Sequence, residues 1–109
     1  MYKRQSLKKV AGVISCAISE MDRVGRTGDN EFSVIIPEKN KRQAQELADK
    51  IRCNVEAVFL NESESGRRLT VSAGVSENPL DGTTAEELFD RSRASVNLAK
   101  SQGKNRVAV

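Results

Sequence analysis

The sequence Arg26-Thr27-Gly28-Asp29-Asn30-Glu31-Phe32 decides the fold of this chain, because it places turn residues between two extended runs. Residues 23–27 form a short extended piece, and residues 28–30 carry the chemistry of a tight turn. Residues 31–36 then alternate apolar and polar side chains before a proline. The apolar members of that alternation are Phe32, Val34 and Ile36. The pattern predicts a β-hairpin, with these three side chains in the core.

Helical periodicity flanks the hairpin on both sides. Residues 6–21 place apolar side chains three and four positions apart, and residues 40–60 repeat this spacing after Asn40, a suitable capping residue. A third helix begins at a capping box formed by Thr83 with Glu86 or by Thr84 with Glu87, and it ends near Gly103. The predicted apolar faces are Leu7, Val10, Ala11, Ile14 and Ile18; then Ala44, Leu47, Ala48, Ile51, Val55 and Val58; then Leu88, Phe89, Val96 and Ala99.

Two further strands complete the predicted order of elements. Residues 61–66 are polar and predict a loop, residues 69–75 alternate as a strand, and residues 105–109 form a short final strand. The order is helix, strand, strand, helix, strand, helix, strand. Such an order favours an α+β fold in which helices pack on a mostly antiparallel sheet, as one domain over residues 1–109.

Composition excludes several classes of function. The chain has no histidine, so the commonest general base and the triads that use it are absent. Cys16 and Cys53 have no partners at metal-ligand spacing and are expected to be free thiols. No apolar run is long enough to span a bilayer, which predicts a cytoplasmic protein. The net charge of +3 is scattered and lacks interleaved aromatic residues, so a nucleic-acid binder ranks last.

Three stretches together resemble the GGDEF domain of bacterial diguanylate cyclases. They are residues 26–32, the strand Leu69-Thr70-Val71-Ser72-Ala73-Gly74-Val75, and the closing segment Ala99-Lys100-Ser101-Gln102-Gly103-Lys104-Asn105-Arg106-Val107. Residues 7–11 also resemble the helix that precedes the signature hairpin in that family. The resemblance covers nearly the whole chain and rests on the order and separation of these pieces.

The resemblance implies a ferredoxin-like palm of the nucleotide-cyclase type, an α/β fold. It also implies that the chain is a partial domain that lacks the family's first strand and helix, which carry a metal-binding Asp and the guanine-reading residues. In the family, two facing domains condense two GTP molecules into cyclic di-GMP. A gap left by a missing strand would have to be filled, so we expect a homo-oligomer or association with another signalling domain.

The signature itself departs from the family pattern. It reads Gly28-Asp29-Asn30-Glu31-Phe32, with Asp29 in place of the second glycine and Asn30 in place of an acidic residue that helps to hold Mg²⁺. Glu31 matches the remaining acidic position and is the one candidate catalytic and metal-binding carboxylate. A neutral amide is a poorer ligand for a hard cation, so magnesium binding is doubtful here.

Other functional positions of the family are partly retained. Lys100 matches a lysine that contacts the GTP phosphates, and Lys104 stands where the family has an arginine, so it supplies charge without a bidentate fork. The family's inhibitory product site has the pattern RxxD, and here only Asp22 of that pair is present. The resemblance therefore implies weak GTP binding at best and no intact inhibitory site.

These residues leave two functions open within the family. The favoured one is a catalytically degenerate GGDEF domain of cyclic di-GMP signalling, which acts as a regulatory or protein-binding module. The alternative is a fragment of an active diguanylate cyclase whose first strand lies upstream.

Overall fold

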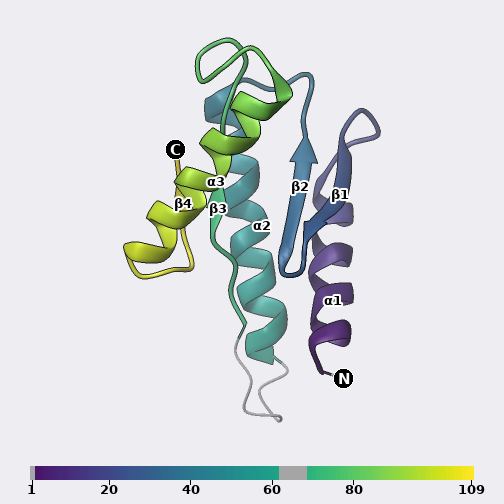
Figure 1. Ribbon diagram of the computed structural model, residues 1–109. Helices are drawn as coiled ribbons and strands as arrows, with labels where there is room; N and C mark the ends of the chain where they lie inside the picture. The colour runs from purple at the N-terminus through teal and green to yellow at the C-terminus, as the bar shows by residue number, and fades with distance from the viewer. Residues whose placement is uncertain (1, 62–68) are drawn as a thin grey trace. The chain divides into compact units, whose positions relative to one another are not determined.

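The computed structural model describes residues 2–61 and 69–109, and it divides the chain into two compact units, Met1–Lys39 and Asn40–Val109. The order of elements is α1, β1, β2, α2, β3, α3, β4 (Figure 1), as the sequence predicts. Of the predicted loop at 61–66, residue 61 ends a helix and the others lie outside the described residues. None of the described helices is long and apolar enough to cross a bilayer.

In the first unit, α1 spans Tyr2–Ala17, whereas residues 6–21 were predicted. Val10 and Ile14 of the predicted apolar face are buried. The helix ends early because a turn follows it: the Asp22 carboxylate accepts hydrogen bonds from the Ser19 amide, at 2.9 Å, and from its hydroxyl, at 3.0 Å. A side chain that bonds local backbone in this way competes with the next helical turn. Ile18 therefore lies beyond the helix.

The predicted hairpin is present. β1 (Arg23–Gly28) pairs antiparallel with β2 (Glu31–Ile35), and the register is irregular between Arg26 and Gly28, next to the turn. Figure 1 shows the two strands joined by this tight turn. Phe32, Val34 and Ile36, which were predicted for the core, are each only partly buried.

In the second unit, α2 spans Lys41–Asn61 and begins after Asn40, as predicted. The Asn40 side chain accepts from the Gln43 amide at 2.9 Å, and the Gln43 side chain accepts from the Asn40 amide at 3.0 Å, which caps the helix in both directions. Leu47, Val55 and Phe59 form its buried side. Phe59 was not on the predicted face.

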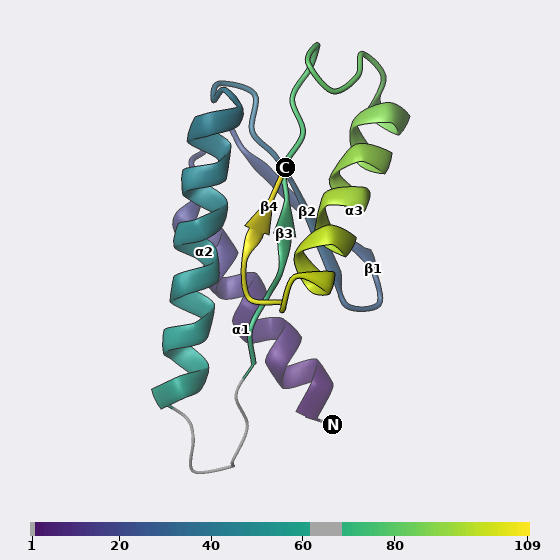
Figure 2. The same cartoon turned by 90° about the vertical axis from the view of Figure 1, so that its left-hand side faces the viewer.

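The other two predicted strands are much shorter in the structure. β3 (Ala73–Gly74) pairs in parallel with β4 (Val107–Ala108), where strands at 69–75 and 105–109 were predicted. The final strand cannot begin at Asn105, because that residue has a φ of 50°, outside the extended region. With so short a partner, residues 69–72 have no pairing in the described sheet. Both α2 and α3 contact this strand pair, which runs between them in Figure 2.

α3 spans Ala85–Ser101 and is anchored at both ends. Of the two predicted capping boxes, the structure forms the one between Thr84 and Glu87. At the other end Gly103 has a φ of 123°, and its amide bonds the Lys100 carbonyl while the Lys104 amide bonds that of Ala99. These are the two hydrogen bonds of a Schellman motif, which a glycine at this position favours.

Candidate functional site

The signature turn is closed by an arginine from its own hairpin. Arg26 Nη2 donates to the Asp29 carbonyl at 2.6 Å, and Arg26 Nε donates to the Gly28 carbonyl at 3.2 Å. The same guanidinium lies 3.5 Å from the Asp29 carboxylate, although both side chains are largely exposed. The Asp29 side chain therefore adds a negative charge that is turned toward Arg26.

Glu31, the candidate catalytic carboxylate, lies partly buried at the start of β2. Its Oε2 accepts a hydrogen bond from the Thr27 hydroxyl, which also lies 2.8 Å from the Ser33 hydroxyl. A Cβ at Gly28 would come within 3.1 Å of the Glu31 Cβ, so glycine allows Glu31 to lie close over the turn. Asn30 is exposed, and Phe32 is partly buried.

The described residues are a poor match for a magnesium site. Within residues 2–61 and 69–109, no three histidine, cysteine or acidic side chains gather closely enough to hold a metal ion. At the turn, Asn30 offers a neutral amide next to the one matching carboxylate, Glu31. Because Mg²⁺ prefers carboxylate and phosphate oxygens, this turn fits the ion poorly.

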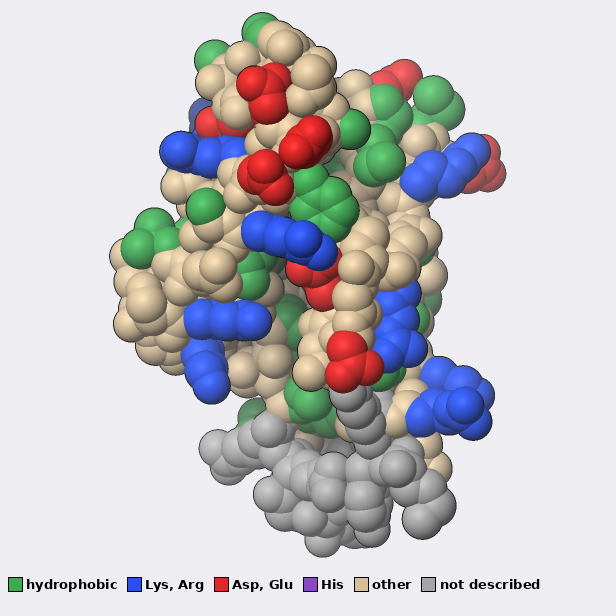
Figure 3. All heavy atoms as spheres, viewed as in Figure 1, with side chains coloured by type: hydrophobic (Ala, Val, Ile, Leu, Met, Phe, Trp, Pro, Cys, Tyr) green, Lys and Arg blue, Asp and Glu red, His purple; other side chains and the backbone are tan. Residues whose placement is uncertain are grey.

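The two candidate phosphate-binding lysines lie at the end of α3. Lys100 is in its last turn, Lys104 follows it, and both are exposed. Figure 3 shows basic side chains at the surface over this part of the chain, while two acidic residues, Glu86 and Glu87, lie in the first turn of the helix. This placement suits the helix dipole as well as an anionic ligand. The lysines belong to the second unit and the signature turn to the first.

Asp22, the remaining residue of the predicted inhibitory site, is 5% exposed. Its carboxylate is engaged by Ser19 within the turn that ends α1. The structure therefore gives Asp22 a local role in the fold.

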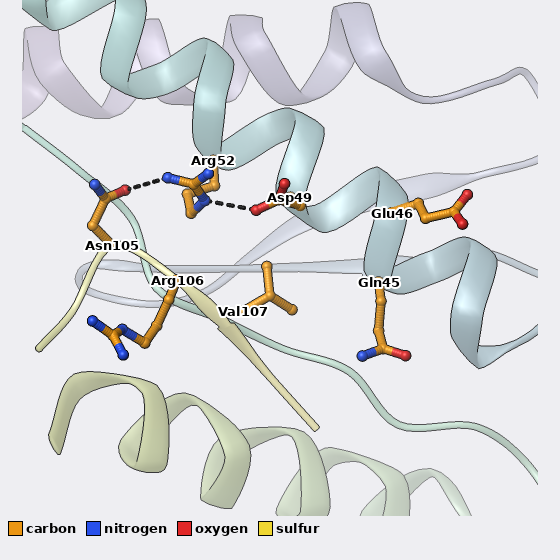
Figure 4. A pocket seen from close by; sticks show the side chains of 7 residues that line it. All are labelled: Gln45, Glu46, Asp49, Arg52, Asn105, Arg106 and Val107. Atoms are coloured by element: carbon orange, nitrogen blue, oxygen red, sulfur yellow. Dashed lines mark hydrogen bonds and ion pairs between the residues drawn. The ribbon is translucent and has the colours of Figure 1, made fainter. Parts of the chain in front are cut away.

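A cluster around Arg52 was not predicted from the sequence. Arg52 Nη1 donates to Asn105 Oδ1 at 3.1 Å, Arg52 Nε donates to Asp49 Oδ1 at 2.8 Å, and Asn105 Nδ2 donates to Glu56 Oε2 at 2.6 Å. Figure 4 shows Arg52 between Asn105 and Asp49 at one end of an open groove of about 500 Å³. The hydrogen bond with Asp49 raises the pKa of Arg52, so the guanidinium stays protonated. The spacing of Asp49, Arg52 and Glu56 on one helix face was the available signal.

A second unpredicted cluster surrounds Asp81. Its carboxylate accepts from Lys41 Nζ at 2.8 Å and from the Glu77 amide at 2.9 Å, with Arg91 Nε 3.7 Å away. The bond from Lys41, followed by that from Glu77, holds the pKa of Asp81 below its ordinary value. This cluster ties the start of α2 to the loop before α3.

Comparisons with known proteins give the family of this chain. The family described as "Diguanylate cyclase, GGDEF domain" matches residues 5–106. Diguanylate cyclase VdcA of Vibrio cholerae is 34% identical over 85 residues, which are 75% of this chain and 25% of that protein. Diguanylate cyclase A of Treponema denticola is 28% identical over 103 residues, which are 94% of this chain and 28% of that protein. The chain thus spans about a quarter of the length of these curated relatives.

Solved structures have the same fold. The GGDEF domain of DgcB from Caulobacter crescentus, solved in complex with c-di-GMP, gives a TM-score of 0.76 at 22% identity, over 95% of this chain and 62% of that one. An EAL/GGDEF domain protein from M. capsulatus gives a TM-score of 0.72 at 25% identity, over 96% and 68%. These neighbours support the predicted cyclase-type palm. The family match over nearly the whole sequence establishes that this chain belongs to the GGDEF domain family of the diguanylate cyclases.

Proposed function

We propose that this chain acts in cyclic di-GMP signalling as a catalytically degenerate GGDEF domain, with a regulatory or protein-binding role. The observation that carries the proposal is the composition of the signature turn. Asn30 supplies no charge where the family has a carboxylate, and Asp29 adds one where the family has glycine. Phosphoryl transfer depends on cations that neutralise the developing charge, and this turn offers them the Glu31 carboxylate beside a neutral amide.

The contacts of the turn support the same proposal. The Thr27 hydroxyl already occupies Glu31 Oε2, and the Asp29 carboxylate faces Arg26. A triphosphate that approached the turn would meet the Asp29 charge and would have to compete for Arg26. Both effects weaken the binding of a polyanion, although the pair is exposed and screened by solvent.

Weak binding of GTP through its phosphates is part of the proposal. Lys100 and Lys104 place two positive charges near the end of α3, where the dipole also favours cations, so the helix itself does not attract an anion there. The attraction must come from the two ammonium groups, which bind phosphate as point charges.

The test is incubation of the chain with GTP and Mg²⁺, followed by chromatography of the products. We expect no cyclic di-GMP above a no-protein control, while an active relative such as the Vibrio cholerae cyclase, assayed in parallel, gives product. Synthesis by this chain would refute the degenerate assignment and favour the alternative, a fragment of an active diguanylate cyclase.

We also propose a cytoplasmic location, and association with a second copy or another signalling domain. Large apolar side chains support association: Ile35 is 69% exposed in the first unit, and Leu80 is 71% exposed in the second. Exposed side chains of this size favour contacts with a partner when they form part of a patch. Light scattering coupled to size exclusion at micromolar concentration measures the mass, and a monomer would refute self-association.

A further inference from the structure

The turn that carries Lys104 has an unusual backbone. Lys104 has a φ of 64° and Asn105 a φ of 50°, so two successive residues other than glycine lie in the left-handed region. Asparagine tolerates this conformation, whereas lysine adopts it rarely. Something in the surrounding structure must therefore hold the turn in this shape.

The backbone of Lys104 is held at both of its polar groups. Its amide donates to the Ala99 carbonyl at 3.0 Å, and its carbonyl accepts from Arg106 Nε at 3.2 Å. These bonds fix the peptide units on either side, but they are formed within the turn and with its own helix. They do not connect the turn to the rest of the unit.

The connection is made by the Asn105 side chain. Its oxygen accepts from Arg52 at 3.1 Å, and its nitrogen donates to Glu56 at 2.6 Å, so both ends of the amide are engaged by α2. Arg52 Nη1 and Glu56 Oε1 are 3.9 Å apart, so Asn105, Arg52 and Glu56 all contact one another. Asp49 accepts a hydrogen bond from Arg52 Nε and so holds the other edge of the guanidinium. The Arg52 side chain is only 17% exposed, so solvent competes weakly for it.

We propose that Arg52 and Glu56 are positioning residues for Lys104: through Asn105 they hold the left-handed backbone that sets where the Lys104 side chain projects. The proposal rests on the proposed role of Lys104 in binding nucleotide phosphates. It assigns α2, which carries none of the signature residues, a part in shaping the phosphate site. The ligand class is a polyphosphate, because a lysine attracts phosphate oxygens without reading a base.

Arg52→Lys and Asn105→Ala test the proposal. The lysine retains the charge of Arg52 but lacks the two separate nitrogens with which the guanidinium bonds Asp49 and Asn105, and the alanine removes the bridge itself. The matched control is Arg42→Lys on the same helix, because Arg42 is highly exposed and pairs with Glu46 of α2. Asn105→Gly is a second variant, since glycine allows the left-handed backbone without supplying the bridge.

Two readouts separate this proposal from the proposed function. The first is the Cα and Cβ chemical shifts and the amide-to-Hα coupling of Lys104 in labelled protein without ligand, which report its φ directly. The second is the dissociation constant for inorganic tripolyphosphate, followed through the Lys104 amide. Amide signals of α2 confirm that each variant is folded.

We expect Arg52→Lys and Asn105→Ala to lose the left-handed signature of Lys104 and to bind tripolyphosphate roughly threefold to tenfold more weakly, the effect of losing hydrogen bonds to charged groups that position a ligand. Asn105→Gly should weaken binding as well, and Arg42→Lys should match the wild type in both readouts. A Lys104 that keeps its left-handed signature in both Arg52→Lys and Asn105→Ala would overturn the inference. If the wild type fails to bind tripolyphosphate, the phosphate role of Lys104 is refuted, while loss of the signature in Arg52→Lys would still support the positioning contact.

Discussion

Gly74 lies where α3 packs on β3, and its replacement by alanine should destabilise the second unit severely. A Cβ at this position would lie 2.2 Å from the Ser92 carbonyl oxygen, 2.8 Å from the Val96 amide nitrogen and 2.9 Å from the Ser95 Cβ. Two of these atoms belong to the helix backbone, so no side-chain rotation can relieve the clash. The helix would have to move away from the strand.

The size of the effect follows from what holds the helix in place. Ser76 Oγ donates to the Leu88 carbonyl at 2.7 Å and lies 2.6 Å from Ser92 Oγ, while Ala99 is fully buried. Displacing the helix strains these contacts, and overpacking of a core costs up to about 3 kcal/mol. Against a total stability of about 5 to 15 kcal/mol, a loss of that size lowers the melting temperature by roughly 12 to 24 °C.

The assay is thermal and urea denaturation followed by circular dichroism at the helical wavelength. Gly12→Ala is the matched control: Gly12 is exposed in α1, nothing beyond its chain neighbours and the nearby helix backbone lies within 4 Å of its added Cβ, and alanine is a better helix former by about 1 kcal/mol. Replacement of glycine by alanine should therefore stabilise the protein at position 12, in α1, and destabilise it at position 74, where β3 meets α3. A Gly74→Ala chain that melts at the wild-type temperature would show that α3 does not pack against β3 in this way.

Three other predictions concern the cluster around Asp81, the N-terminal cap of α3 and nucleotide binding. Because the folded-state pKa of Asp81 lies below its unfolded value, its contribution to stability is present above the unfolded value of about 4 and is lost as pH falls through the folded pKa. Asp81→Asn should thus be less stable by about 1 to 2 kcal/mol at neutral pH, with a smaller loss of stability on acidification in urea titrations. Thr84→Ala should cost about 1 kcal/mol of stability by removing the side chain that accepts from the Glu87 amide, whereas Thr83→Ala should cost much less. In calorimetry, GTP and ATP should bind with similar, weak affinity through Lys100 and Lys104, and a clear preference for GTP would contradict this.

Local chemistry explains which parts of the fold could be predicted from the sequence. The hairpin follows from three turn residues between a short extended piece and an alternating run, and both ends of α3 follow from a capping box and a glycine. Each of these features depends on interactions between residues close in the sequence, so it can be predicted from the residue types alone. The early end of α1 at Ala17 was missed because Asp22 bonds back to Ser19, an interaction that periodicity does not reveal.

The shortened strands have a different cause. The alternation of apolar and polar residues over 69–75 indicates that successive side chains face opposite sides. A strand, however, also needs a hydrogen-bonding partner along its whole length. That partner, β4, is confined to Val107–Ala108 because Lys104 and Asn105 have a left-handed backbone. The sequence pattern predicted the turn at Gly103 and not at these two residues.

The signature turn depends on residues close in the sequence, whereas the network that supports Lys104 depends on residues far apart in it. The differences between this turn and the family signature can be read from the sequence, because Asp29 and Asn30 occupy positions whose chemistry the resemblance defines. The bond between Arg52 and Asn105 spans 53 positions of sequence, and only the folded chain brings the two together. Arg52, Asp49 and Glu56 read as an ordinary exposed charge pattern on a helix, yet the 17% exposure of the Arg52 side chain shows that the pattern serves a tertiary contact. If the positioning role of Arg52 holds, a chain with Asn30 in place of one carboxylate of the signature still keeps the backbone geometry of Lys104, its candidate phosphate-binding lysine, which is what a domain retained for binding would require.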